Sequence, residues 1–373
     1  MKFSCDRIQL LAGLTNAARA AAAKSTIPAL EGLLLTAEQD QLTITGYNLK
    51  TGVRTRVRAD VAEEGGIVLN ARLFGDIVRK MSDSFIRMEA DSSMLVKLDC
   101  GRSSFEIMGS NAEDFPELPA VEEENTFHIQ EAKLKSMIDQ TLFAVSTNES
   151  RPVHTGSLFE AEGKELTVVS VDGFRLALRR EALLEDAGET RISFVVPAAA
   201  LTEVGRIAAA DGEDAASIHL GSRHILFSIG DSEVISRKLE GEFLDYRKSI
   251  NGISKYDLLF QRRELLDAFE RVSLIISEKY KSPVRCTFGY GSVTLNSATA
   301  LGKATDECPM KGNADDLEIG FNNRFMLDAL RAAPVDEIML KLLNGSSPCV
   351  MVPADGSDSF LYLVLPVRIR SEA

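Results

Sequence analysis

The chain has 373 residues, 45% of them hydrophobic and 26% charged, and carries a formal net charge of −13. This length exceeds what one hydrophobic core ordinarily supports, so we expect two or three domains. The acidic balance argues against a protein that coats nucleic acid by bulk electrostatic attraction.

The five cysteines are scattered along the chain, with no C-x-x-C pair and no secretory segment. Such cysteines are typical of reduced thiols in a cytosolic protein. No stretch approaches the roughly 18 apolar residues that a membrane span needs. We therefore expect a cytoplasmic protein without membrane contact.

Apolar residues at helical spacing predict six helices, over residues 7–24, 72–80, 131–141, 198–210, 262–274 and 323–331. The first covers an apolar stretch that Gln9, Asn16 and Arg19 interrupt, which favours an amphipathic helix over a targeting signal. Together the six stretches hold 14 Lys or Arg and 8 Asp or Glu, whereas the rest of the chain holds 28 and 47. The predicted helices are therefore basic within an acidic protein.

A short apolar strand that leads into a helix occurs three times along the chain. Aligned on Ala71, Ala198 and Asn322, the copies lie 127 and 124 residues apart. One third of the chain is also about 124 residues, so a repeat of this length would fill it. Each third opens on a further strand and helix and continues into alternating patterns broken by turn residues, such as Gly163 and Asp172-Gly173.

This repeat predicts an α+β fold of three tandem domains, each with two helices and about eight short strands. The predicted domains are residues 1–124, 125–252 and 253–373. Short strands of neighbouring domains could pair across the boundaries, which would leave one free sheet edge at each end of the row. Two chains joined head to tail through these edges would close a ring of six domains. Because the helices are the basic elements, we expect them on the inside of the ring.

Five distinctive motifs occur along the chain in this order: Met1-Lys2-Phe3, SVDGFRLA at 170–177, GEFLDYRKSI at 241–250, EIGFNNRFMLDAL at 318–330 and LPVRI at 365–369. Together they resemble the bacterial sliding clamps, the β-subunit family of DNA polymerase III. The resemblance covers the entire chain. It implies a head-to-tail homodimeric ring that encircles duplex DNA without sequence preference and has no cofactor. The implied partners are the replicative polymerase catalytic subunit, other polymerases and repair proteins with short hydrophobic clamp-binding peptides, and a separate ATP-driven clamp loader.

The resemblance also implies three sets of site residues. A peptide cleft between the second and third domains would use His154, Val171, Gly173, Phe174, Arg175, Leu176, Leu244, Lys248, Leu363, Leu365, Pro366, Val367 and Arg368. Phosphate contacts to DNA would come from Lys24, Arg72, Asn148 and Arg151, and the basic helices add Arg79, Lys80 and Arg206. The dimer contact would place Phe105 and Ile107 of one chain against Leu274 and Ile275 of the other.

Each set also has a purely structural interpretation. The segment around Phe174 would by itself indicate a turn and a buried strand, a lone surface arginine is often only solvated, and the four dimer residues could belong to the core. Phe174, Leu244, Lys248 and His154 also differ from the family's usual residues, which are histidine, proline, arginine and an apolar residue. We expect these differences to bear on partner preference.

No motif for catalysis is present in the sequence. A P-loop, G-x-S-x-G and H-E-x-x-H are all missing, and the four histidines have no cysteine at metal-ligand spacing. Two alternatives to the clamp remain at this stage. One is an enzyme on a repeated α+β scaffold with a carboxylate site that no motif marks, and the other is a protein-only scaffold without nucleic acid.

Overall fold

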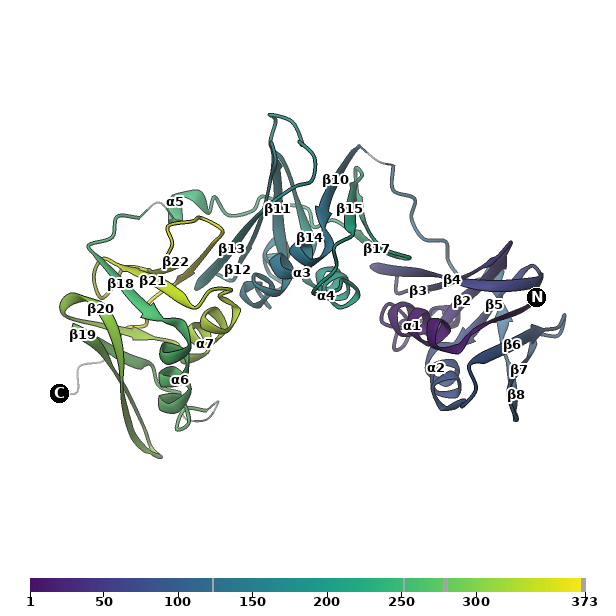
Figure 1. Ribbon diagram of the computed structural model, residues 1–373, viewed down its shortest axis with the longest axis horizontal. Helices are drawn as coiled ribbons and strands as arrows, with labels where there is room; N and C mark the ends of the chain where they lie inside the picture. The colour runs from purple at the N-terminus through teal and green to yellow at the C-terminus, as the bar shows by residue number, and fades with distance from the viewer. Residues whose placement is uncertain (123, 251, 278, 280, 370–373) are drawn as a thin grey trace. The chain divides into compact units, whose positions relative to one another are not determined.

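The computed structural model describes residues 1–122, 124–250, 252–277, 279 and 281–369, so the last residues of the third predicted domain, 370–373, lie outside the described part (Figure 1). The chain forms two compact units, Met1–Lys135 with Ala199–Lys238 and Ser136–Ala198 with Leu239–Ala373. Each unit contains one extended antiparallel sheet with helices, which confirms the α+β class.

The sheet of the first unit has 13 strands, with the main order β10-β15-β16-β17-β4-β1-β6-β7-β8. β2 and β3 join it through β4, and β5 and β9 follow β2. The strands are β1 (Lys2–Asp6), β2 (Gly32–Glu38), β3 (Gln41–Tyr47), β4 (Thr51–Glu63), β5 (Gly65–Asn70), β6 (Phe85–Ala90), β7 (Leu95–Cys100), β8 (Ser103–Met108), β9 (Ser110–Asn111), β10 (Asn125–Gln130), β15 (Ala215–Leu220), β16 (His224–Ile229) and β17 (Ser232–Arg237).

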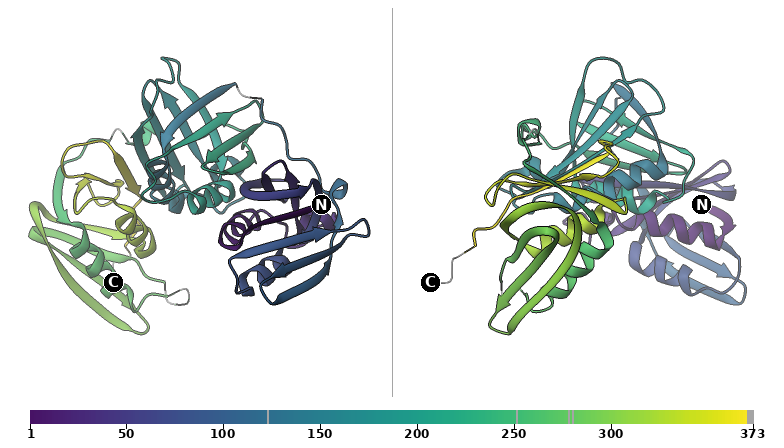
Figure 2. Two further views of the ribbon diagram at one scale, coloured as in Figure 1. Left: turned by 45° about the vertical axis from the view of Figure 1, so that its right-hand side comes forward. Right: turned by 60° about the vertical axis from the view of Figure 1, so that its left-hand side comes forward.

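The sheet of the second unit has ten strands in the order β14-β11-β12-β13-β23-β22-β21-β18-β20-β19. These are β11 (Gly156–Glu162), β12 (Glu165–Val171), β13 (Arg175–Ala182), β14 (Ile192–Pro197), β18 (Tyr256–Gln261), β19 (Val284–Thr299), β20 (Gly302–Phe321), β21 (Glu337–Leu342), β22 (Cys349–Pro353) and β23 (Phe360–Val364). Figure 2 shows the long hairpin that β19 and β20 form.

Seven α-helices accompany the sheets in the described part of the chain. They are α1 (Arg7–Ala17), α2 (Ala71–Lys80), α3 (Glu131–Asp139), α4 (Ala198–Ile207), α5 (Arg247–Ile250), α6 (Arg262–Ser273) and α7 (Asn323–Ala332). Short 3-10 turns occupy Pro28–Glu31, Ala112–Asp114, Leu142–Ala144 and Pro152–Thr155. Five of the six predicted helices therefore end within three residues of their expected bounds.

The first predicted helix is shorter than expected, because it ends at Ala17 rather than at Lys24. The chain turns over Ala18 to Ala20, and the Ala22 N–H then donates to the Leu30 carbonyl at 2.8 Å. A continuing helix would need that N–H for its own backbone bond. The contact with the following 3-10 turn thus overrides the helix propensity of the alanine run.

Helix starts follow the capping residues that the sequence offers. The Asn70 side chain accepts a hydrogen bond from the Leu73 N–H at 2.9 Å, and Asn322 accepts one from the Arg324 N–H at 3.0 Å. α2 then buries Phe74, Ile77 and Val78 and leaves its polar face outward. These caps mark two of the three strand-to-helix junctions that define the repeat, and in the third α4 follows β14 directly at Ala198.

Strands pair across two of the predicted domain boundaries, as expected. In the first unit β17 of the second third pairs with β4 of the first third, with Val234 opposite Val53. In the second unit β13 pairs with β23, with Leu176 opposite Leu363. The middle third therefore contributes strands to both sheets.

The number of strands departs from about eight in two of the thirds. Among the described residues, the first third has nine strands, the second eight and the third six. The third has fewer because β19 and β20 are 16 and 20 residues long.

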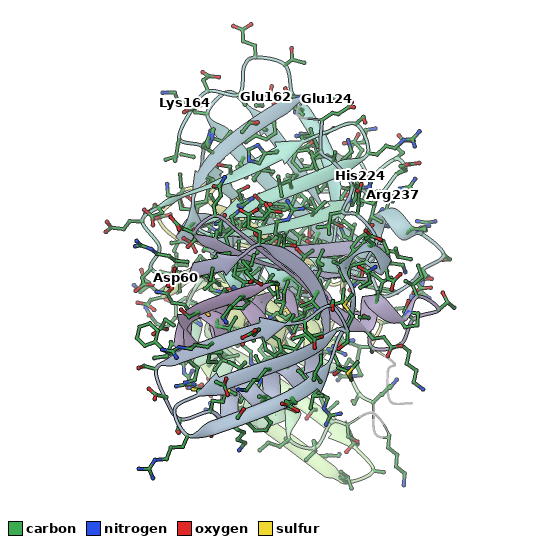
Figure 3. All side chains as sticks on the ribbon, turned by 90° about the vertical axis from the view of Figure 1, so that its right-hand side faces the viewer. Asp60, Glu124, Glu162, Lys164, His224 and Arg237 are labelled. Carbon is green, nitrogen blue, oxygen red and sulfur yellow. The ribbon has the colours of Figure 1, made fainter. Side chains whose placement is uncertain are left out.

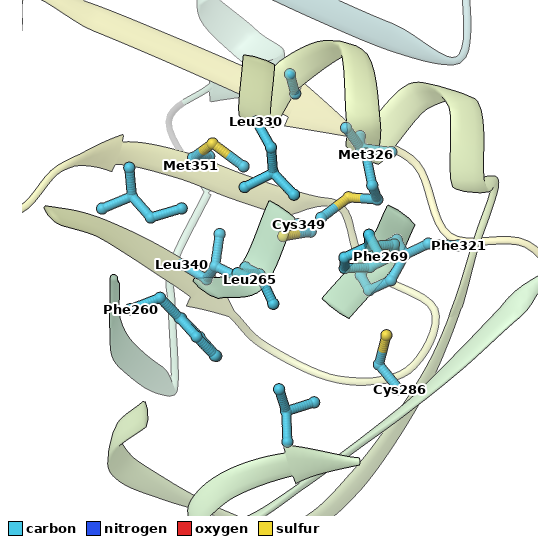
Figure 4. Close-up of a cluster of buried hydrophobic side chains, with 14 of the residues drawn as sticks. Phe260, Leu265, Phe269, Cys286, Phe321, Met326, Leu330, Leu340, Cys349 and Met351 are labelled. Carbon is cyan, nitrogen blue, oxygen red and sulfur yellow. The ribbon is translucent and has the colours of Figure 1, made fainter. Parts of the chain in front are cut away.

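The core of the third repeat gathers α6 and α7 against its strands (Figure 4). Phe260, the expected anchor of the opening strand, is buried beside Leu265 and Phe269 at helical spacing. Cys286 and Cys349 lie in the same apolar cluster, and burial raises the pKa of the Cys349 thiol to about 12. All five cysteines are free and buried, so they pack as small apolar side chains.

Candidate functional site

An apolar cluster in the second unit brings together residues of the predicted peptide cleft. Val171 closes β12, Leu176 lies near the start of β13, and Leu363 comes from β23. These three side chains are 2%, 3% and 5% exposed and belong to one cluster, against which Leu365 also packs. The cluster arises because β13 and β23 are hydrogen-bonded neighbours, which places residues far apart in the sequence on one apolar surface.

The tight turn between β12 and β13 presents Phe174. Asp172 Oδ1 accepts hydrogen bonds from the N–H groups of Phe174 at 2.9 Å and Arg175 at 3.0 Å, and Gly173 adopts a φ of +92°. The turn leaves Phe174 61% exposed, with its ring stacked on Phe325 of α7 at a centroid distance of 6.3 Å. The Phe174 carbonyl also accepts a hydrogen bond from the Leu365 N–H at 2.8 Å, so the turn and the C-terminal segment are joined.

Further predicted cleft residues lie at the surface. Leu244 is 45% exposed and Val367 is 40% exposed, although both are apolar. Lys248 is exposed and pairs with Asp245 at 3.0 Å. Pro366 is half-buried beside Val367, and Arg368 is exposed. Together with Phe174, these residues offer exposed apolar and cationic groups on segments that continue from the buried cluster.

His154 is half-buried and its ring meets Phe243 edge to face at 5.3 Å. Burial lowers the pKa of His154, and the nearby charge of Arg151 lowers it further. The neutral form of the imidazole is therefore favoured near pH 7, and the ring presents a weakly polar aromatic surface beside Phe243.

The resemblance places Arg175 among the residues of the peptide cleft, whereas in the structure its side chain is buried and its charge is already paired. Its side chain is 7% exposed, and it donates hydrogen bonds to Asp172 at 2.9 Å and to Asp328 of α7 at 2.7 Å. Its guanidinium also lies over the Phe325 ring, 4.5 Å from the centroid. Two carboxylates thus already neutralise the charge, and the residue ties β13 to α7.

Several residues of this surface escaped the sequence prediction. Tyr246 is 2% exposed within the cluster, Val153 is buried beside it, and Phe243 packs against it. Tyr246 and Phe243 lie inside the motif GEFLDYRKSI, and Phe325 lies inside EIGFNNRFMLDAL. Their aromatic character was the available signal, but the same character is equally typical of core residues.

Candidate DNA-binding residues of the first unit lie on its helices, except Lys24, which follows α1 because that helix ends at Ala17. Arg72 is 94% exposed and lies 4.0 Å from Asp76, which also pairs with Arg79 at 2.6 Å. A hollow of about 670 Å³ lies between α1 and α2, and Arg72 and Arg79 line it together with Arg19. Lys24 and Lys80 are exposed, and Arg206 of α4 pairs with Glu203 at 2.9 Å.

The two candidate DNA-binding residues of the second unit share one surface turn. Asn148 Oδ1 accepts a hydrogen bond from the Ser150 N–H at 3.0 Å, and the Asn148 carbonyl accepts one from the Arg151 N–H at 3.4 Å. Both residues are exposed. Asn148 therefore shapes the turn that presents the Arg151 side chain.

Phe105 and Ile107 lie on β8, an end strand of the first sheet, whereas Leu274 and Ile275 follow α6. Among the described residues, β8 pairs only with β7, and β19 pairs only with β20. Phe105 on β8 is 40% exposed, whereas Ile107 packs against the core of the first repeat. Leu274, which follows α6, is 83% exposed.

The end of α6 is fixed against the end of β19. Ser297 Oγ donates a hydrogen bond to the Val272 carbonyl at 2.6 Å, and Thr299 Oγ1 donates one to the Ile275 carbonyl at 3.1 Å. Arg271 of α6 also forms an ion pair with Asp306 of β20. Leu274 and the free edge of β19 therefore belong to one rigid surface.

Other charged and titratable groups lie along the strands and their turns. In the part of the chain that the structure describes, no three His, Cys, Asp or Glu side chains gather to hold a metal ion. His224 lies opposite Arg237 in the β16–β17 pair, and Glu162 and Lys164 flank the β11–β12 turn (Figure 3). Burial lowers the pKa of His224 and the charge of Arg237 lowers it further.

No helix among the described residues has the length and apolar character that crossing a membrane requires.

Comparison with known families accounts for almost the whole chain. Residues 1–119 match the N-terminal domain of the DNA polymerase III beta subunit, residues 128–245 its central domain, and residues 254–368 its C-terminal domain. The chain belongs to this family. The three-domain clamp architecture expected from the repeat is therefore confirmed.

Individual relatives agree with this assignment. The beta sliding clamp of Halalkalibacterium halodurans is 30% identical over 99% of this chain and 100% of its own length. The crystal structure of the DNA polymerase sliding clamp from Bacillus subtilis has a TM-score of 0.93 at 28% identity, and that of the Pseudomonas aeruginosa clamp bound to griselimycin has the same values. Each of the two comparisons covers 99% of this chain and 100% of the chain in the crystal structure. The sliding-clamp function is thus favoured over an enzyme on the same scaffold.

Proposed function

We propose that two copies of the chain join head to tail into a ring that encircles duplex DNA, and that each copy holds partner proteins through one apolar cleft. The observation that carries the ring is that each unit has an end strand with an exposed apolar side chain beside it, β8 in one unit and β19 in the other. Each edge has exposed apolar side chains beside it, Phe105 on β8 and Leu274 beside β19. An exposed apolar edge strand is unfavourable in water and favours strand pairing with a second chain.

The cleft is formed by the buried floor around Leu176 and Leu363 and by the exposed Phe174, Leu244 and Val367. A short peptide with leucine or phenylalanine anchors would bury these exposed groups. Lys248 and Arg368 are the cations available to orient such a peptide, because Arg175 is already neutralised by Asp172 and Asp328.

Contacts to DNA are proposed for phosphates only, because base-edge contacts would stop a ring from sliding. Arg72 and Arg79 have one carboxylate, Asp76, between them, so the pair keeps a net positive charge. Lys24, Lys80, Asn148, Arg151 and Arg206 complete the proposed set.

The remaining assignments also rest on the family and the sequence. We propose the replicative polymerase catalytic subunit, other polymerases and repair proteins as partners, and a clamp loader that opens the ring. The domains proposed are residues 1–124, 125–252 and 253–373. The cytoplasm is proposed as the location, and catalysis is assigned to the partners.

Retention on DNA tests this function. The labelled protein would be loaded onto a nicked circular plasmid with a clamp loader and ATP and then passed through a gel-filtration column. A ring stays with the circle in moderate salt and leaves once a restriction enzyme cuts it, because only topology holds it there. Retention that is the same on cut and circular plasmid would contradict the proposal.

A further inference from the structure

The segment that carries Leu244 and Lys248 is attached to the body of the second unit by one buried carboxylate. Glu160 lies on β11, and its side chain is 8% exposed. Leu244 and Lys248 flank Tyr246 and Arg247, which are the two residues of this segment that contact Glu160. Sequence reasoning did not single out Glu160, which is 86 residues from Tyr246.

Both oxygens of the Glu160 carboxylate are engaged. The Tyr246 hydroxyl donates a hydrogen bond to Oε2 at 2.5 Å, and Arg247 donates to Oε2 at 2.6 Å and to Oε1 at 3.2 Å. The guanidinium of Arg247 lies over the Tyr246 ring, 4.6 Å from its centroid. A buried carboxylate is costly unless it is paired and hydrogen-bonded, and this arrangement provides both.

The same attachment fixes the local backbone. The N–H groups of Ser249 and Ile250 donate to the Tyr246 carbonyl at 2.9 and 3.1 Å, so α5 follows directly from Tyr246. The Tyr246 ring also packs in the apolar cluster with Val171 and Leu176. Tyr246 is therefore held by the cluster at its ring and by Glu160 at its hydroxyl, which leaves one orientation for the segment.

We propose that Glu160 is a positioning residue for the peptide cleft, and this inference rests on the proposed function of that cleft. Through Tyr246 and Arg247 it holds Leu244 and Lys248 in place before a peptide arrives. Without this anchor the segment would have to become ordered during binding, and ordering costs affinity. We expect Glu160→Gln to weaken peptide binding about tenfold, which corresponds to 1.4 kcal/mol.

The test measures fluorescence anisotropy with the full-length protein. The probe is a fluorescein-labelled hexapeptide whose only apolar residues are one leucine and one phenylalanine. Glu162→Gln is the matched control, because Glu162 lies two residues further along β11 and pairs at the surface with Arg191 at 2.7 Å. Tyr246→Phe is a second variant that removes only the hydroxyl contact and retains the ring in the apolar cluster.

Two further readouts separate positioning from a general loss of structure. Hydrogen exchange of residues 242–250 is expected to become faster in Glu160→Gln and Tyr246→Phe but not in Glu162→Gln, while hydrogen exchange of the β11–β12 and β21–β22 pairs of the same unit stays the same. In a Leu244→Ala/Lys248→Ala background, Glu160→Gln should cause little further loss of affinity, because the segment then lacks the two side chains that are proposed to contact the peptide.

Each outcome has one meaning. Wild-type affinity in both Glu160→Gln and Tyr246→Phe would overturn the positioning role, and so would a full tenfold loss in the Leu244→Ala/Lys248→Ala background. Failure of the wild-type protein to bind the probe, or griselimycin in its place, would instead contradict the proposed cleft itself.

Discussion

Replacing Leu274 by alanine tests the proposed ring contact at its most exposed apolar residue. Leu274 is 83% exposed in the single chain, and complete burial of a leucine side chain contributes about 1.5–3 kcal/mol. A head-to-tail dimer contains the same contact twice, so the variant should weaken the dimer by roughly 3–6 kcal/mol. That corresponds to a dissociation constant about 150-fold to roughly 20,000-fold higher.

Sedimentation equilibrium measures this change directly, because the single chain has a mass of 40.7 kDa. Ile253→Ala is the control, since Ile253 is also 83% exposed but precedes β18, an inner strand that pairs with both β20 and β21. The control should sediment as the wild-type dimer, while Leu274→Ala shifts toward the single-chain mass. Equal dissociation constants for the two variants would refute the assignment of this surface to the dimer.

Three more predictions follow from the charged and titratable groups. Arg175→Met should lower the free energy of unfolding by about 3–5 kcal/mol, because it removes the buried cation that Asp172 and Asp328 share. Arg324→Met should lower it by less than about 1 kcal/mol, because Arg324 is exposed and lies 3.9 Å from Asp328. Urea denaturation measures both, and equal costs would contradict the structural role of Arg175. A plot of log affinity for DNA against log salt concentration should become less steep by about 2 in the double variant Arg72→Glu/Lys24→Glu, because each residue is proposed to neutralise one phosphate. The control Lys164→Glu, on the β11–β12 turn, should leave the steepness unchanged. Because the pKa of His154 is lowered on folding, the unfolded state binds the proton more readily. His154 therefore stabilises the fold above its unfolded pKa and loses this contribution as the pH falls below that pKa. Thermal melts from pH 7.5 to 5.5 should accordingly show a smaller decline of the midpoint in His154→Gln than in the wild type.

The repeat made much of the fold predictable. The helical spacing of Leu73, Ile77 and Val78 is a local signal, and the structure has a helix there, although Phe74 is buried and Leu73 is 48% exposed. The caps Asn70 and Asn322 are local as well. The end of the first helix was not predictable in the same way, because the bond between Ala22 and the Leu30 carbonyl forms only in the folded chain.

The same distinction applies to the candidate site. Resemblance identified Val171, Leu176, Leu363 and Leu365, and the structure brings these side chains into one cluster. It could not show that Arg175 is neutralised by Asp328, 153 residues away. Nor could it reveal the contact between Glu160 and Tyr246, because the spacing of buried polar partners in the sequence carries no periodic signal.

Negative-stain electron microscopy of the purified protein tests the central proposal most directly. We expect flat, closed rings of two chains with a central hole wide enough for duplex DNA. Compact particles without a hole, at a concentration where sedimentation shows the dimer, would contradict the proposed ring.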